Sequence, residues 1–198
     1  MNSRIPDLID KIAKLEHQLA EETRKQQEHF KYQLEGTRVR FEAAVLQAHR
    51  KLRRAVIPWL LSSRVRNVLS VPFIYSMIVP LAFLDLTITL YQHVCFRLYD
   101  IRRVRRSDYV VMDRHQLAYL NHVEKLNCVY CGYGNGVVAY AREVIARTEQ
   151  YWCPIKHARR VAGSHRRYDN FLGYGDGEGY KAELVRFRQQ LQEEDTGK

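Results

Sequence analysis

The chain has 198 residues, enough for one or two domains. Its 32 basic and 22 acidic side chains give a formal net charge of +10, and residues 51–127 carry most of the excess, with 12 basic and 5 acidic side chains. Because this excess flanks the most apolar part of the chain, it favours a membrane surface over nucleic acid as a partner. The basic runs at 101–106 and 157–167 show no helix-turn-helix, RNP or C2H2 pattern, so nucleic-acid binding is disfavoured.

The N-terminal region, residues 1–56, is polar and charged, and we expect one long helix over 3–56 rather than a cleaved signal peptide. Apolar residues recur there at the heptad spacings of a coiled coil: Leu8, Ile12, Leu15 and Leu19. The seam resumes at Phe30, eleven residues later, which indicates a stutter. Gly36 weakens the helix by about 1 kcal/mol relative to alanine. The seam predicts either a homo-oligomer or one amphipathic helix packed on the chain's own domain.

Residues 57–100 are predicted to insert into a membrane. The stretch from 68 to 96 contains only two ionisable side chains, Asp85 and His93, and is apolar on all faces. A spanning helix needs about 20 apolar residues, so it must extend past Asp85, which then requires a polar partner. The alternative is a buried core helix of a soluble protein, and the length of the apolar stretch argues against it.

The topology of this membrane segment stays open at the level of the sequence. Five basic residues lie on each side of it, so the positive-inside rule gives no orientation. A re-entrant hairpin that bends at Pro80 or near Asp85 would keep both flanks on the cytoplasmic face, and a single span is the other solution. The arginines predicted at the membrane surface are Arg53, Arg54, Arg102, Arg103, Arg105 and Arg106. The aromatic residues that could be either interfacial anchors or packing residues are Trp59, Tyr75, Tyr91 and Tyr99.

The stretch 113–126 predicts a further helix, with Asp113 as its N-cap. His115 and His122 are seven residues apart and hence on one side of that helix. They are either surface histidines or spare metal or proton ligands.

The cysteines suggest a metal site. Cys128 and Cys131 have the C-x2-C spacing of a metal-binding turn, and Gly132 would let the backbone turn beneath the two sulfurs. Cys153 and His157 follow with a C-x3-H spacing. Without an export signal, clustered cysteines are better explained as ligands or redox thiols than as disulfides. The set predicts a closed structural Cys3His zinc site; the alternatives are an iron or dithiol redox site and cysteines that share no ion.

Part of this region resembles known families. CVYCGYG at 128–134 resembles the first metal knuckle of rubredoxins, and CP at 153–154 resembles the start of their second, although Ile155 and Lys156 stand where the fourth cysteine should follow. More broadly, the stretch from VRRSDYVVMDRHQLAYLN through RTEQYWCPIKHARR, with CVYCGYGNG at its centre, is similar to a family of uncharacterised, membrane-associated bacterial proteins. That resemblance implies a bacterial inner-membrane location and transfers no catalytic residue.

Two further features could carry chemistry. Three roles are open for Glu149: a general acid or base, a partner that orients His157, or one half of an exposed ion pair with Arg147 or Arg142. The segments GYGNG (132–136) and GYGDG (173–177) echo one another and match no phosphate-binding motif, so we interpret both as turns.

The sequence as a whole predicts a mainly α-helical protein. Its parts are a coiled-coil-like helix (1–56), a membrane segment (57–100), a small metal-binding domain (101–180), and a C-terminal helix with a polar tail (181–198). We expect a membrane-anchored interaction or scaffold module whose zinc is structural and whose C-terminal domain faces the cytoplasm. A membrane-bound redox protein and a membrane-surface hydrolase or transferase are the alternatives, so enzymatic activity stays open.

Overall fold

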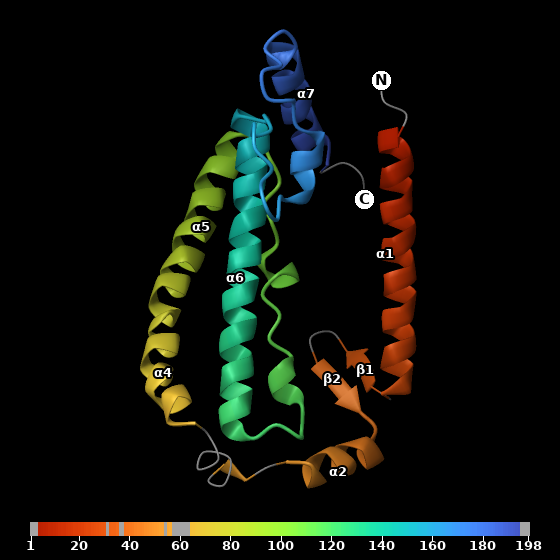
Figure 1. The fold of residues 1–198 in the computed structure, drawn as a ribbon, viewed down its shortest axis with the longest axis vertical. Helices are drawn as coiled ribbons and strands as arrows, with labels where there is room; N and C mark the ends of the chain where they lie inside the picture. The colour runs from red at the N-terminus through yellow and green to blue at the C-terminus, as the bar shows by residue number, and fades with distance from the viewer. Residues whose placement is uncertain (1–3, 31, 36–37, 54, 57–63, 195–198) are drawn as a thin grey trace. The chain divides into compact units, whose positions relative to one another are not determined.

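The computed structural model describes residues 4–30, 32–35, 38–53, 55–56 and 64–194, and these are mainly α-helical, as predicted (Figure 1). The chain forms two compact units. The first comprises residues 1–62 and 113–126, and the second comprises residues 63–112 and 127–198.

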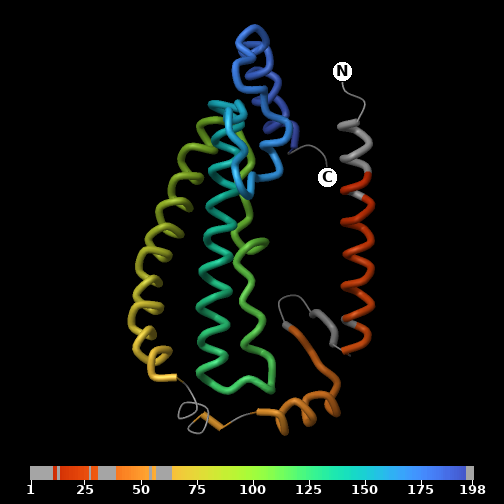
Figure 2. Tube along the Cα trace, viewed as in Figure 1, coloured from red at the N-terminus to blue at the C-terminus, as the bar shows by residue number. Residues whose placement is uncertain are grey.

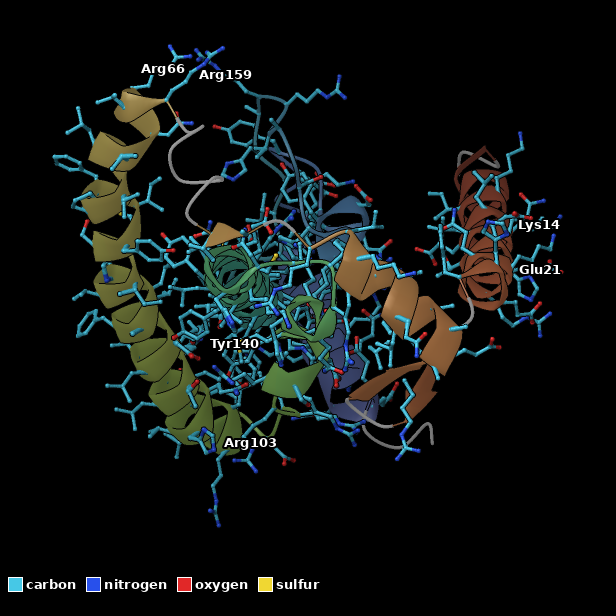
Figure 3. All side chains as sticks on the ribbon, turned by 90° about the horizontal axis from the view of Figure 1, so that it is seen from below. Lys14, Glu21, Arg66, Arg103, Tyr140 and Arg159 are labelled. Carbon is cyan, nitrogen blue, oxygen red and sulfur yellow. The ribbon has the colours of Figure 1, made fainter. Side chains whose placement is uncertain are left out.

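The first unit begins with helix α1 (Arg4–His29). Three residues of the predicted seam are exposed on it: Ile12, Leu15 and Leu19. Figure 3 shows the charged side chains of Lys14 and Glu21 projecting from the same helix. The described part of the chain does not cover the seam, so its use in self-association stays a prediction.

The prediction of one helix over 3–56 is wrong beyond His29. An antiparallel pair of strands follows, β1 (Tyr32–Glu35) and β2 (Arg38–Phe41), and then helix α2 (Ala43–Lys51). The physical reason is visible in the sequence: large apolar residues alternate with polar ones on both sides of Gly36, which is the period of a strand. Residues 36 and 37 themselves lie outside the described residues.

The helix predicted over 113–126 is also wrong in its bounds. Only Arg114–Gln116 form a short 3-10 turn (η2), and the long helix α6 begins at His122. Asn121 is its N-cap: Asn121 Oδ1 accepts from the Glu124 N–H at 3.0 Å, and Glu124 Oε2 accepts from the Asn121 N–H at 2.8 Å. This reciprocal pair is a capping box, whereas Asp113 makes no side-chain cap bond.

The second unit opens with helices α4 (Val65–Ser76) and α5 (Ile78–Leu98), which form one bent rod (Figures 1 and 2). The bend falls at Met77 because Pro80 has no N–H to donate to the Ser76 carbonyl. The chain does not fold back at Pro80 or Asp85, so the hairpin alternative is not found. Within the described residues, Val65–Leu98 is one helix of 34 residues that is long and apolar enough to cross a membrane.

A soluble core helix would be mostly buried, and this one is not. Its most apolar stretch of 18 residues has a mean hydropathy of 1.9, yet only 6% of that stretch is buried. The segment is therefore an apolar helix whose surface is left largely uncovered by the rest of the described chain.

Helix α6 (His122–Trp152) runs beside α4 and α5 in the same direction (Figure 1). After Leu98 the chain reverses at Asp100, whose φ is 56°, and returns toward the start of α6 as segment 101–112, which is irregular apart from one 3-10 turn, η1 (Arg106–Asp108). The core of this unit includes the fully buried side chains of Phe96, Tyr140 and Val144. Figure 3 shows Tyr140 in the interior.

The C-terminal helix is confirmed as α7 (Tyr180–Glu193). The GYGDG segment before it is a turn, as predicted: the Asp176 N–H donates to the Gly173 carbonyl at 3.1 Å, and Gly175 has a φ of 90°.

Candidate functional site

The structure does not bring the four predicted zinc ligands together. Cys128 and Cys131 lie one turn apart inside α6, and Cys153 directly follows the last residue of that helix. At 1.5 Å per residue, the helix separates Cys131 from Cys153 by about 33 Å. His157 lies farther on, with its ring stacked on Tyr168 at a centroid distance of 6.1 Å. No single ion can bind all four side chains of one chain, because the helix holds the C-x2-C pair about 33 Å away from Cys153.

The other predicted ligands do not complete a site either. His115 lies in the η2 turn and His122 at the first turn of α6. Among the residues that the structure describes, no group of three or more His, Cys, Asp or Glu side chains is placed to hold a metal ion. All four cysteines are free thiols.

We expect the purified full-length protein to carry well below one equivalent of zinc or iron, because no more than two predicted ligands lie near each other. Elemental analysis and the melting temperature with and without a chelator measure this, and the chelator should leave melting unchanged. A stoichiometric metal that disappears in Cys128→Ser but persists in the control Cys95→Ser would contradict the expectation.

Glu149 is paired neither with His157 nor with Arg147, two of the partners that the sequence suggested. Glu149 Oε2 lies 2.8 Å from Nε2 of His165, and His165 Nδ1 accepts from the Tyr168 N–H at 3.1 Å. Arg147 pairs instead with Glu143 at 2.9 Å. The local sequence does not reveal His165 as this partner, since no helical or strand spacing relates it to Glu149, sixteen residues earlier.

The GYGNG segment is not a turn but the middle of α6, where its glycines permit close packing. A Cβ atom at Gly136 would lie 2.7 Å from both the Tyr109 carbonyl oxygen and the Val110 Cα, and one at Gly132 would lie 3.2 Å from the Val111 carbonyl oxygen. The irregular segment 101–112 therefore packs directly against the backbone of α6. Gly132 and Gly136 lack a side chain and therefore let the backbone of another segment approach the helix closely, a common role of glycine besides turn formation.

The single carboxylate of the apolar helix, Asp85, has the polar partner that the sequence analysis required. Arg106 donates to it with two bonds, Nε to Oδ1 at 2.8 Å and Nη2 to Oδ2 at 2.6 Å. The Tyr133 hydroxyl of α6 donates to Oδ2 at 3.0 Å. A bidentate Arg–carboxylate pair is among the stronger ion pairs in proteins. The hydrogen bonds and charge of Asp85 outweigh the effect of burial and raise the pKa of Arg106 above its ordinary value.

Further polar contacts join α4 and α5 to α6 along their length. The Tyr130 hydroxyl donates to the Ile74 carbonyl at 2.6 Å, next to the bend. Tyr91 and Thr148 share a hydrogen bond of 2.9 Å between their hydroxyls. Gln92 bonds the Tyr140 hydroxyl, the Val104 carbonyl at 3.3 Å and the Val104 N–H at 3.0 Å. The inner face of the apolar helix therefore combines core residues such as Ile88 and Phe96 with polar side chains that have hydrogen-bond partners.

The three described candidate anchors are packing residues. The Tyr75 hydroxyl donates to Asn127 Oδ1. Tyr91 bonds to α6 as above, and the ring of Tyr99 stacks on Tyr151 at a centroid distance of 4.7 Å. Trp59 lies outside the described residues.

The structure describes five of the six arginines that were predicted at the membrane surface. Arg106 forms the ion pair with Asp85. Three others line a cavity of about 170 Å³: Arg102, Arg103 and Arg105. Figure 3 shows Arg103 projecting away from the ribbon. Arg53 is exposed, and Arg54 lies outside the described residues.

Arg167 is the centre of a polar network that fastens α7 to α6. Its guanidinium donates to Glu143 Oε1 at 3.0 Å, to Gln150 Oε1 at 2.8 Å, and to both carboxylate oxygens of Glu194, at 2.9 and 3.0 Å. Burial alone would raise the pKa of Glu194, but the hydrogen bonds and charge of Arg167 outweigh it and lower that pKa below its ordinary value.

Because the pKa of Glu194 is lower in the folded than in the unfolded chain, its contribution is present above about pH 4.5 and is lost as the pH falls through the folded value. The side chain is 43% exposed, so we expect about 1 kcal/mol or less. Unfolding of wild type and Glu194→Gln measured between pH 6 and pH 3 should show a difference that shrinks below about pH 4.5. Glu178→Gln, at an exposed position, is the control; a difference independent of pH would exclude this role for Glu194.

Comparison of the chain with family models, with curated proteins and with solved structures gives no match in any of the three. The resemblance to membrane-associated bacterial proteins and the activity of the chain therefore stay predictions, and the function rests on the geometry described above.

Proposed function

We propose that this chain is a membrane-anchored interaction or scaffold protein, and that the outer face of α4–α5 is its anchoring surface. The observation that carries the proposal is a continuous exposed apolar face along the whole helix. Its exposed members recur every three or four residues, except for one step of six across the bend: Val65, Leu69, Phe73, Val79, Phe83, Leu86, Leu90, Val94 and Leu98. Soluble proteins rarely leave so large a contiguous apolar patch in water.

The arrangement of the inner face supports the same conclusion. Residues such as Ile88, Gln92 and Phe96 face the core and are buried. Asp85, which would be costly near lipid as an isolated charge, is neutralised by Arg106. The helix therefore presents mostly apolar side chains to the hydrocarbon and holds Asp85 and Gln92 against its own fold. His93 is exposed, and its Nδ1 lies 2.7 Å from the Thr89 carbonyl oxygen of the same helix.

For the location, we propose the bacterial inner membrane with the C-terminal part in the cytoplasm. Free thiols fit a reducing compartment. Cys131 and Cys153 are exposed, so a membrane-impermeant maleimide should label them in broken cells but not in intact cells. Rapid labelling in intact cells would place them outside the cytoplasm and overturn this orientation.

The exposed seam of α1, with Leu15 and Leu19, is the surface we assign to self-association or to a helical partner. No partner chemistry beyond an apolar helix follows from it. Zinc is not part of this proposal, because the predicted ligands lie apart within one chain.

We expect the double variant Leu86→Lys/Leu90→Lys to lose membrane association while keeping its helicity. Both side chains are exposed, with fractions of 67% and 63%, so the lysines disturb no core contact. Each lysine costs up to about 3 kcal/mol at the centre of the hydrocarbon core and less nearer the headgroups. Flotation of the protein with vesicles measures the loss, and Val185→Lys, on the exposed surface of α7, is the matched control. A wild-type chain that stays in the soluble fraction would end the proposal.

A further inference from the structure

The exposed apolar face of α4–α5 is longer than a bilayer is thick. A helix of 34 residues is about 51 Å long, whereas the hydrocarbon core of a bilayer is about 30 Å thick. The exposed face nevertheless runs from Val65 to Leu98, with Leu98 itself 76% exposed. If the helix stood upright in the membrane, roughly 20 Å of this face would have to lie outside the hydrocarbon.

The chain segment beside the helices is the second obstacle to an upright position. Arg106 reaches Asp85, which is thirteen residues from the end of α5, so the irregular segment lies beside the middle of the rod. The same segment touches α6 at Gly132 and Gly136. It is not shielded on its outer side, because Val111 is 54% exposed and Met112 is 42% exposed.

Irregular backbone at hydrocarbon depth is tolerated only where protein or a water-filled cavity surrounds it, because lipid cannot bond its N–H and C=O groups. An upright helix pair would put this segment at that depth with one side open. The buried residues of the rod, Ile88, Gln92 and Phe96, all lie on α5 and on the side that packs against the core. A helix that packs its own fold on one side and exposes apolar residues on the other can lie along a membrane interface.

From these two observations we propose that α4–α5 lies in the plane of one membrane leaflet. Its outer face is immersed at the boundary between headgroups and acyl chains, and α6 with segment 101–112 forms the layer on the water side. Arg66 and Arg97, near the two ends of the rod, are exposed and can meet lipid phosphates, which the net charge of +10 also favours. The inference rests on the proposed anchoring function and specifies its geometry as monotopic.

The test is a depth measurement along the rod. Spin labels are placed singly at Leu69, Phe83 and Leu98 of a full-length chain whose four cysteines are replaced by serine. Power-saturation EPR is then recorded in vesicles that contain anionic phosphatidylglycerol. The in-plane arrangement predicts that the three depths agree within about 5 Å, inside the shallow zone that interfacial helices occupy. A label at Val185 on α7 is the control and should report water.

A profile that is deepest at Phe83 and shallow at both ends would show a spanning helix and overturn the inference while leaving the anchoring function intact. Vesicle flotation is a separate readout: a chain that does not float with the vesicles would contradict the anchoring function itself. If the serine background loses its helicity, oriented circular dichroism of wild type in stacked bilayers decides instead. The band polarised along the helix axis should persist, because α4–α5 and α6 share one direction, and its loss would mean upright helices.

Discussion

The Gly136→Ala variant is expected to lose about 1–3 kcal/mol of unfolding free energy, the usual cost of overpacking a filled site. The added Cβ atom would lie 2.7 Å from two backbone atoms of the facing segment, the Tyr109 carbonyl oxygen and the Val110 Cα. Backbone atoms cannot rotate away as a side chain can, so either the segment or the helix must move. This loss outweighs the gain of about 1 kcal/mol that alanine brings to a helix interior.

The matched control is Gly134→Ala, two residues earlier in the same helix. Its Cβ atom would lie 3.2 Å from Leu81 Cδ1, the end of a flexible side chain that can shift. We therefore expect Gly134→Ala to be near neutral or stabilising. Urea unfolding of both variants in the same detergent measures the difference, and a Gly136→Ala chain as stable as the control would refute the close packing.

Removing Arg106 is expected to be the second large perturbation. The Arg106→Gln variant leaves the Asp85 carboxylate, which is 13% exposed, without its bidentate partner. Breaking a buried pair costs about 3–5 kcal/mol, and we expect about 2–3 kcal/mol here because Arg106 is 42% exposed and the pair is partly solvated. Thermal unfolding followed by circular dichroism gives the loss.

The double variant Asp85→Asn/Arg106→Gln separates the pair from its two members. With no isolated charge left, and with Tyr133 still able to donate a hydrogen bond, it should be at least about 1 kcal/mol more stable than Arg106→Gln alone. Arg103→Gln, at an exposed arginine of the same segment, controls for the general loss of positive charge. If the double variant is less stable than Arg106→Gln, then Arg106 does not stabilise the fold through its bond to Asp85.

Composition and local sequence pattern predict several elements of this fold correctly. The apolar helix around Asp85, the need of that carboxylate for a partner, the C-terminal helix and the GYGDG turn all follow from hydropathy, charge and glycine spacing over short stretches. Each is a property of neighbouring residues, and such properties survive any tertiary arrangement.

Other predictions failed because a local pattern fits two structures. The apolar spacing across Gly36 fits a continuous helix. The alternation of apolar and polar residues on both sides of that glycine fits two strands, and the structure has the strands. The sequence offers two possible N-caps for this region, Asp113 and Asn121. Only Asn121 is followed three residues later by a glutamate, Glu124, and this capping box is the one that forms.

The sequence by itself determined that the chain has one long apolar helix flanked by arginines, because hydrophobicity and charge are additive along the chain. The tertiary structure decided what the C-x2-C and glycine motifs mean. Cys128 and Cys131 lie inside a helix, and Gly132 and Gly136 are required in that helix because the backbone of residues 109–111 packs against it. That requirement comes from residues some 25 positions away, and so does the choice of Arg106 as the partner of Asp85. Contacts between distant residues carry no local period, which is why only the folded chain shows them.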